Sequence, residues 1–294
     1  MKPAPFEYKA PDSIEEALTL MRDYGSDAKI LAGGQSLVPA MNFRVVQPSI
    51  LIDLNRVGEL NYIQPENQEV RIGAMTRERR LEFEPLISKS FPLLAEAMPH
   101  VAHPQIRNRG TLGGSLANAD PAAELPVIML ALEARLKVCS ASGESWVDAH
   151  NFFSGMFTTD LAPDEMLVEI LLPAMQPYTG WSFMEVAPRA GDYALMGVAA
   201  LVTLDENGVC RQARLVYLNA GDGPVDAKDA AAILKGQVPG DDVMESAADS
   251  ASQKEINPFG NIHASSDFQR HLARVLTRKA LRQAVKRASR DNLQ

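Results

Sequence analysis

Two glycine pairs, each close to a short apolar segment, constrain this chain of 294 residues more than any other feature. The first pair, Gly33-Gly34, lies in the run AGGQS at 32–36, and the second, Gly113-Gly114, lies in TLGGS at 111–115. Consecutive glycines permit positive φ angles and close approach to the main chain. Successive amides in such turns bind anions, above all phosphate. The two pairs therefore predict two loops that contact a diphosphate ligand, with tight turns that bind nothing as the alternative.

The surroundings of the glycines narrow the kind of ligand. Neither loop matches G-x-G-x-x-G, and neither carries the Gly-Lys-Ser/Thr of a P-loop, which argues against a Rossmann site and a Walker NTPase. Hydroxyl groups flank both glycine pairs and can add donors. Asp120 and Glu124 follow the second loop and offer carboxylates that can accept hydrogen bonds from ribose hydroxyls.

Composition excludes several other classes of protein. Only two cysteines occur, Cys139 and Cys210, so the chain has no disulfide scaffold and no four-cysteine metal cluster. The five histidines form no H-x-x-x-H pattern, and we expect no metal site. A net charge of −8 argues against nucleic-acid binding. No apolar stretch is long enough for a membrane span, and the first residues lack the apolar core of a secretory signal, so we expect a cytoplasmic protein.

Hydrophobic periodicity predicts an α+β fold in which mixed sheets are wrapped by helices. Ser13 and Glu16 form a capping box for a helix that ends at Gly25. Buried strands are expected at 28–32 and 50–54 as a parallel pair, then a strand at 69–74 and proline-punctuated helices over 76–100. A helix is expected over 122–134, with Pro121 near its first turn. Further strands are expected at 134–139, 145–148, 166–172, 181–187, 195–204 and 211–219.

The last part of the chain is predicted to be looser and then helical. Residues 221–267 favour loops and one or two short helices, and an amphipathic helix is expected from Asp267 onward. That helix carries eight basic side chains between residues 270 and 290. A solvated face is the favoured interpretation. The alternative is a face on which Arg274 and Arg278 dock an acidic partner subunit.

The glycine motifs carry a resemblance to a known family. The segments KILAGGQSL at 29–37 and IRNRGTLGGSLANADPAAELP at 106–126 resemble the FAD-binding medium subunits of molybdenum hydroxylases. This group includes the carbon monoxide dehydrogenase medium subunit, quinoline-type oxidoreductases and the flavin segment of xanthine dehydrogenase. Phe6-Glu7-Tyr8, the GDYA turn at 191–194 and the SDFQR stretch at 266–270 match as well, so the resemblance spans nearly the full chain.

The resemblance implies an FAD-binding fold of the vanillyl-alcohol-oxidase (PCMH) type, followed by a C-terminal α+β domain with an antiparallel sheet and helices. The FAD-binding domain is expected at 1–175, with subdomains at about 1–57 and 58–175, and the C-terminal domain at 176–294. The first loop would contact the FAD diphosphate through Lys29, Ile30, Leu31, Ala32, Gly33, Gly34, Gln35, Ser36 and Leu37. The second loop would do so through Thr111, Gly113, Gly114 and Ser115.

The remaining positions are assigned in the same way. Asn118, Asp120 and Glu124 would line the phosphate and ribose region, and Leu167 or Val168 would lie near the adenine or flavin wall. Asp192 and Tyr193 would lie beside the isoalloxazine ring. Neither glycine loop contains histidine, which argues against a covalent histidyl-flavin. Relatives often place a lysine at the position of Glu185, and a cation there would stabilise reduced flavin.

The implied function is electron transfer with no catalytic residue for the substrate on this chain. A large partner subunit with molybdopterin would oxidise a substrate, for which an N-heteroaromatic compound is the favoured class. A small partner subunit with two [2Fe-2S] clusters would pass the electrons to non-covalently bound FAD, and from there they would reach an external acceptor. The assembly expected is a heterotrimer or its dimer. A stand-alone FAD oxidoreductase of the same fold and a non-enzymatic assembly protein are the alternatives.

Overall fold

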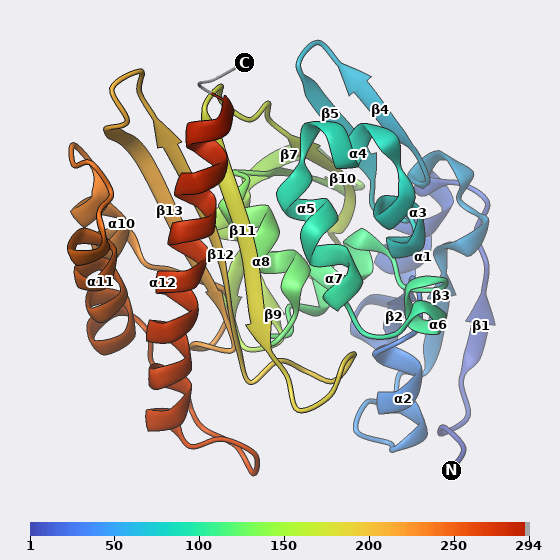
Figure 1. The fold of residues 1–294 in the computed structure, drawn as a ribbon. Coiled ribbons are helices and arrows are strands. Elements are labelled where there is room, and N and C mark those ends of the chain that lie inside the picture. Colours follow the sequence, from blue (N-terminus) through green and yellow to red (C-terminus); the bar gives the residue numbers. More distant parts are fainter. Residues whose placement is uncertain (292–294) are drawn as a thin grey trace.

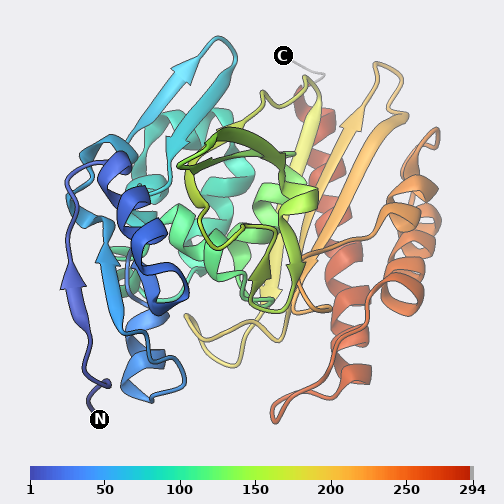
Figure 2. The same ribbon diagram turned by 180° about the vertical axis from the view of Figure 1, so that it is seen from behind.

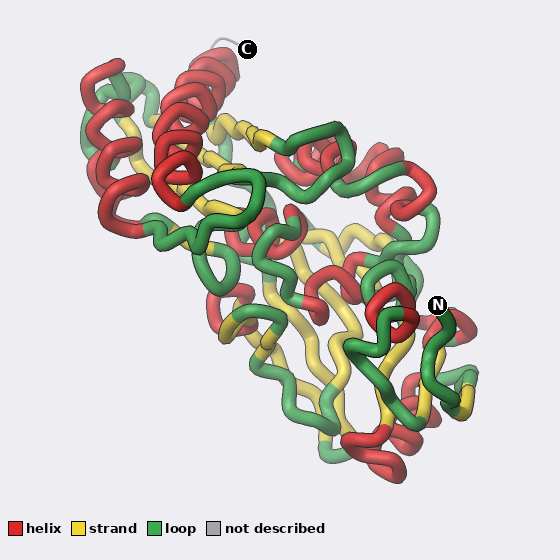
Figure 3. The backbone as a smooth tube through the Cα atoms, turned by 90° about the horizontal axis from the view of Figure 1, so that it is seen from below, coloured by secondary structure: helices red, strands yellow, loops and turns green. Residues whose placement is uncertain are grey.

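The computed structural model describes residues 1–291, which form three larger sheets and a two-stranded hairpin with helices packed against them (Figure 1). The N-terminal sheet is parallel and the two sheets that follow are antiparallel. The α+β class expected from periodicity is therefore confirmed. Seen from below, the N-terminal sheet and the C-terminal sheet lie at opposite ends of the molecule (Figure 3).

The N-terminal sheet has the strand order β1-β3-β2 and carries the first glycine loop. Its elements are β1 (Glu7–Lys9), α1 (Ile14–Tyr24), β2 (Ala28–Leu31), α2 (Leu37–Asn42) and β3 (Ile50–Asp53). The backbone amide of Glu16 donates to Ser13 Oγ at 3.1 Å, which confirms the predicted cap of α1. The predicted parallel pair is confirmed by the register of Ala28 with Ile50. The expectation of a buried first strand is wrong, because β2 lies near an edge of the sheet and Lys29 is exposed.

The middle sheet has the order β4-β5-β10-β6-β7 and curves around the centre of the molecule (Figure 2). Its strands are β4 (Ile63–Glu66), β5 (Glu69–Gly73), β6 (Arg135–Ser140), β7 (Gly143–Asp148) and β10 (Met166–Leu172), beside a hairpin of β8 (Phe153–Gly155) and β9 (Thr158–Thr159). Its helices are α3 (Glu78–Phe83), α4 (Pro85–Ser90), α5 (Pro92–Ala97), α6 (Pro104–Arg107), α7 (Leu112–Asn118), α8 (Glu124–Ala131) and α9 (Ala149–Phe152). Pro85 and Pro92 begin α4 and α5 within the predicted range 76–100, and Pro104 begins α6 beyond that range.

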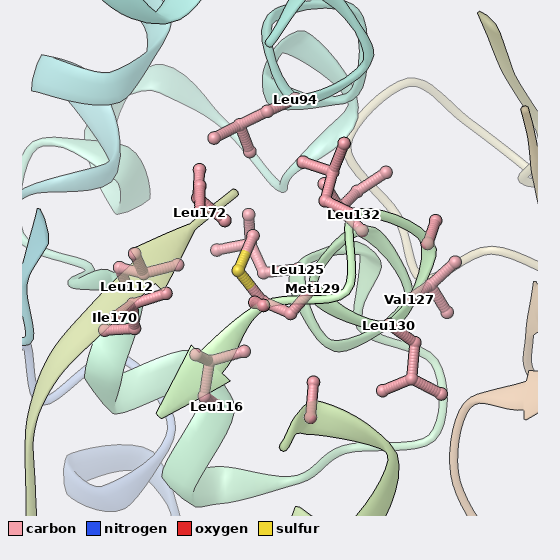
Figure 4. Close-up of a cluster of buried hydrophobic side chains, with 14 of the residues drawn as sticks. Leu94, Leu112, Leu116, Leu125, Val127, Met129, Leu130, Leu132, Ile170 and Leu172 are labelled. Atoms are coloured by element: carbon pink, nitrogen blue, oxygen red, sulfur yellow. The ribbon is translucent and has the colours of Figure 1, made fainter. Parts of the chain in front are cut away.

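Helix α8 is the centre of the largest hydrophobic cluster. Every one of its residues is buried. Figure 4 shows Leu125 and Met129 of α8 among Leu112 and Leu116 of α7 and Ile170 of β10. The helix is shorter than predicted: it begins at Glu124, and Pro121 precedes it in a turn instead of lying in its first turn.

The C-terminal sheet has the order β11-β12-β13-β14 and is covered by the last helix. Its elements are β11 (Thr179–Val186), β12 (Met196–Leu204), β13 (Cys210–Leu218), β14 (Val225–Asp226), α10 (Lys228–Leu234), α11 (Asp241–Ser250), a π-helical turn at Ala251–Glu255, and α12 (Ser266–Asp291). The short helices predicted in 221–267 are confirmed. Gly180 of β11 lies so close to α12 that a Cβ there would be 1.8 Å from the Ala284 carbonyl oxygen.

The cores of the middle and C-terminal sheets are continuous. One hydrophobic cluster contains Ile170 of β10 together with Phe183 of β11 and Leu201 of β12. Arg287 of α12 pairs with Glu96 of α5 at 2.6 Å and also donates to the Trp181 carbonyl at 2.7 Å. The two sheets are therefore joined by apolar packing and by an ion pair.

Within the described part of α12, Arg274, Arg278, Arg282 and Arg287 form ion pairs with carboxylates of the same chain. Arg274 pairs with Asp249 and with Glu245 of α11, and Arg278 also pairs with Glu245 at 3.2 Å. Arg282 pairs with Asp241 at 2.9 Å. Arg274 and Arg278, named in the docking hypothesis, thus already have acidic partners in α11, and docking of a partner subunit on this face stays a prediction.

Candidate functional site

The first glycine loop connects β2 to α2 and presents unpartnered backbone donors. Gly34 has φ +75°, a conformation that favours glycine. Within residues 1–291, the amides from Gly33 to Leu37 donate to no acceptor of the chain; the first amide that does is that of Val38, which donates to the Gly34 carbonyl at 3.1 Å. The side chain of Gln35 donates to the Gly33 carbonyl at 3.1 Å, which braces the loop. Such a run of amides is suited to an anion.

The second glycine loop uses its backbone donors internally. The Leu112 amide donates to the Thr76 carbonyl at 3.0 Å, and the Gly113 amide donates to the Ala74 carbonyl at 2.8 Å. The Gly114 amide donates to Thr111 Oγ1 at 3.1 Å, so Thr111 caps α7. The expectation that both loops offer free glycine amides is therefore wrong for this loop. Its remaining donors are side chains such as the hydroxyl of Ser115.

The two loops are packed directly against each other. A Cβ on Gly33 would lie 2.5 Å from the Arg109 carbonyl oxygen and 2.8 Å from Gly110 Cα. A Cβ on Gly114 would lie 3.3 Å from Ala32 Cβ. The glycines thus allow two segments about 80 residues apart to meet at van der Waals distance, and the structure brings together the two motifs that the sequence predicted as one site.

The segment that follows the second glycine loop carries two buried or half-buried carboxyl groups, Asp120 and Glu124. Asp120 Oδ1 accepts a hydrogen bond from the Ala122 amide at 2.9 Å, and burial raises the pKa of Asp120. Glu124 begins α8 and is only 7% exposed. Burial, and next the charge of Glu185, raise the pKa of Glu124 to about 8. Near neutral pH Glu124 is therefore mostly protonated and can donate a hydrogen bond as well as accept one.

The turn between β11 and β12 carries Asp192 and Tyr193 and packs against His103. Gly191 has φ +85°, and a Cβ there would lie 2.2 Å from ring atoms of His103, which precedes the second loop. Tyr193 is 68% exposed. Partial desolvation, and next the charges of Asp120 and Glu124 where these are ionised, raise the pKa of Tyr193. Figure 1 shows this turn and α2 along the same lower edge of the molecule.

Other predicted residues lie away from open surface. Leu167 of β10 is buried in the cluster that contains Leu112 and Leu116, while its neighbour Val168 faces the N-terminal core. Ile30 and Ala32 are partly buried against that N-terminal core. The half-buried Asn118 ends α7, and Ala119 follows it in a left-handed conformation with φ 48°. The cofactor contacts predicted for these positions stay predictions.

Two buried carboxyl groups, those of Glu185 and Glu78, each keep one oxygen without a hydrogen-bond partner among the described residues. His100 Nδ1 lies 3.1 Å from Glu185 Oε1, and this hydrogen bond raises the pKa of His100. The side chain of Glu185 is 6% exposed, and its Oε2 has no partner. Burial raises the pKa of Glu78 to about 7, and its Oε2 also has no partner. His100 is therefore a basic side chain hydrogen-bonded to Glu185, the position at which the resemblance leads one to look for a lysine.

Residues 1–291 contain no group of three or more His, Cys, Asp or Glu side chains arranged to hold a metal ion. None of the helices in this range has the length and apolar character needed to cross a membrane.

Comparison with known proteins places the site in a family. Residues 4–175 match the family described as FAD binding domain in molybdopterin dehydrogenase, and residues 181–284 match the CO dehydrogenase flavoprotein C-terminal domain. The chain is 42% identical over 288 residues to the 6-hydroxypseudooxynicotine dehydrogenase complex subunit alpha of Paenarthrobacter nicotinovorans, covering 98% of this chain and 97% of that one.

Solved structures agree with this assignment. Carbon monoxide dehydrogenase from Hydrogenophaga pseudoflava superposes with a TM-score of 0.95 at 38% identity, covering 98% of this chain and 99% of that one. Quinoline 2-oxidoreductase from Pseudomonas putida 86 gives 0.93 at 38% identity with the same coverage. The chain belongs to the family of FAD-binding medium subunits of molybdenum hydroxylases. It is thus an FAD-binding oxidoreductase subunit, as the glycine motifs led us to expect.

Proposed function

We propose that this chain holds FAD non-covalently at the two glycine loops and transfers electrons within a molybdenum hydroxylase. One observation supports the binding mode above the others: the amides from Gly33 to Leu37 have no acceptor in residues 1–291, and the second loop packs directly beside them. Amides in this state suit the FAD diphosphate. The second loop would add side-chain donors from Ser115 and Asn118.

The proposed division of labour involves partner subunits. A large subunit would carry molybdopterin and oxidise the substrate, and a small subunit would carry two [2Fe-2S] clusters. Bound FAD would supply the redox chemistry of this chain by taking electrons from those clusters and giving them to an external acceptor. The residues of this chain bind and orient the flavin, with Asp192 and Tyr193 beside its ring. The heterotrimer, or its dimer, is the proposed assembly.

The substrate class is the least constrained part of the proposal. Relatives named for a nicotine derivative, for caffeine and for quinoline support an N-heteroaromatic substrate. Relatives named for carbon monoxide and glyceraldehyde are of comparable similarity. Because the substrate would bind on the large subunit, anaerobic addition of quinoline, nicotine, caffeine, carbon monoxide and glyceraldehyde to the purified complex, with bleaching of the flavin absorbance as readout, would identify the class.

The domain division and the location are proposed with the function. We propose an FAD-binding domain at 1–175 and a C-terminal domain at 176–294, which accords with the separate matches at 4–175 and 181–284. A cytoplasmic location is supported by two cysteines that are buried as free thiols, the usual state in a reducing compartment. Fractionation of cells that express the tagged chain at native level tests the location.

The experiment that tests the function is one native purification from the source organism. We expect a yellow chain of this length to co-elute with one chain that carries iron–sulfur clusters and one that carries molybdenum. Flavin without partner chains would favour the stand-alone oxidoreductase instead. Partner chains without flavin in this subunit would favour the assembly protein. Either of these results would overturn the proposal.

A further inference from the structure

Asn55, directly after the N-terminal sheet, holds the start of the first glycine loop. Its Nδ2 donates to the Ala32 carbonyl at 3.0 Å and also to Asp53 Oδ1. Its backbone amide donates to the same carboxylate oxygen at 2.9 Å. Tyr8 donates its hydroxyl hydrogen to the other oxygen, Asp53 Oδ2. Both Nδ2 hydrogens are therefore used, and the orientation of the Asn55 side chain is defined by its partners.

Arg77, at the start of α3, holds the segment that leads into the second glycine loop. One terminal nitrogen of its guanidinium donates to the Arg109 carbonyl, and the other donates to Asn55 Oδ1. Burial, and next the charge of Arg109, lower the pKa of Arg77. A cation is thus placed where desolvation and a like charge oppose it, while Asp53 and Glu78 favour it.

Together the two side chains bridge the loops. Ala32 begins the first loop, and Arg109 lies two residues before the second. The Arg109 carbonyl that receives the Arg77 hydrogen bond is also the atom against which Gly33 packs. We propose that Asn55 and Arg77 form a clamp that fixes the two glycine loops in register for a diphosphate ligand, without contacting that ligand themselves. The inference rests on the proposed binding of FAD at these loops.

The residue types fit this role. Arginine presents several donors in a planar fork, so one side chain reaches two acceptors at once, and lysine cannot reproduce this geometry. Asparagine joins a donor group, which holds Ala32, to an acceptor, which receives Arg77. Aspartate has the same shape but lacks the donors, and its charge would face Asp53. Preorganisation of this kind raises affinity because the ligand does not have to order the loops when it binds.

The test measures ligand affinity in the absence of redox chemistry. The full chain is prepared without flavin in five forms: wild type, Arg77→Lys, Asn55→Asp, the double variant with both of these substitutions, and Asn55→Ser, which shortens the side chain. Dissociation constants for FAD are measured by flavin fluorescence, and those for ADP, which shares the diphosphate, by calorimetry. Arg80→Lys is the matched control, because Arg80 lies on the same helix, is exposed, and within the described residues its side chain makes polar contacts with Asn61 and Glu84, not with either glycine loop. Thermal unfolding of each apo variant monitors folding.

We expect Arg77→Lys and each Asn55 variant to raise the dissociation constants of FAD and of ADP by the same factor, about tenfold. We expect the control to match wild type. The double variant should lose no more FAD affinity than the single variant that binds FAD more weakly, because the two side chains act as one unit. If folded variants bind FAD within twofold of wild type, or if the single losses add, the clamp is wrong. If wild type binds neither FAD nor ADP, the proposed function itself fails.

Discussion

Gly33→Ala is the sharpest perturbation of the contact between the glycine loops. The added Cβ would lie 2.5 Å from the Arg109 carbonyl oxygen and 2.8 Å from Gly110 Cα, and both are backbone atoms that no side-chain rotation can remove. Gly33 does not have a positive φ, so its backbone conformation itself tolerates alanine. The whole effect therefore comes from forcing the two loops apart.

The expected magnitude follows from the overlap. Forcing one extra carbon into a packed contact costs about 1–3 kcal/mol. For a chain of this size that corresponds to a fall in Tm of roughly 2–8 °C. Displacement of the first loop also disturbs the amides from Gly33 to Leu37, so we expect FAD affinity to fall by about tenfold or more.

Gly58→Ala provides the matched control, because no atom lies within 4 Å of its added Cβ and its φ is not positive. The assay is thermal unfolding of the apo chain together with fluorescence titration of FAD for both variants. Gly58→Ala should keep wild-type affinity and be at least as stable as wild type. Equal Tm and equal FAD affinity for the two variants would refute the argument that glycine at 33 is required by the loop contact.

Three further predictions concern charge. Because the folded pKa of Glu124 is about 8, the folded chain binds an extra proton between about pH 4.5 and 8, so its stability decreases as pH rises through that window, by up to about 1.4 kcal/mol per pH unit. Glu124→Gln should therefore flatten the decrease in Tm between pH 5.5 and 8.5. An unchanged pH dependence of the Tm would contradict the raised pKa of Glu124. Arg287→Met removes the ion pair with Glu96 and should lower the free energy of unfolding by about 1–2 kcal/mol, measured by denaturant unfolding. Arg282→Met removes a more exposed ion pair and should change the denaturant midpoint little. Equal effects of the two variants would count against a stabilising role of the Arg287–Glu96 pair. Arg274→Glu places a carboxylate beside those of Glu245 and Asp249 in α11, and their repulsion should lower the Tm of the isolated chain. A loss of partner binding at unchanged Tm would instead support the docking hypothesis.

Local patterns in the sequence were sufficient for most of the fold. The capping box at Ser13, the apolar runs of β10 and β12, and the prolines that begin α4 and α5 act over a few residues, so the elements they predict are present. The strands β1, β4, β8, β9 and β14 were not predicted. They have two to four residues and are mostly exposed or half-buried, so they show no hydrophobic alternation from which to identify them.

The candidate site was only partly accessible to the same reasoning. Both glycine motifs and the carboxyl groups that follow the second were found from residue types and spacing. The raised pKa of Glu124 was not, because it depends on the burial of this first residue of α8 and on Glu185, which is 61 residues away in the chain. Nothing in the local sequence around Asn55 or Arg77 indicates that each reaches a different glycine loop.

By itself the sequence determined the class of fold, the two loops that require glycine and the family to which the chain belongs, because these depend on residue types and on short-range periodicity. Only the tertiary structure decided which loop keeps free amides, which carboxyl groups are protonated and which arginines of α12 are already paired. Those properties arise when segments distant in the chain meet, since a hydrogen-bond donor is free or satisfied, and a charge is favoured or opposed, only according to the neighbours that folding places beside it.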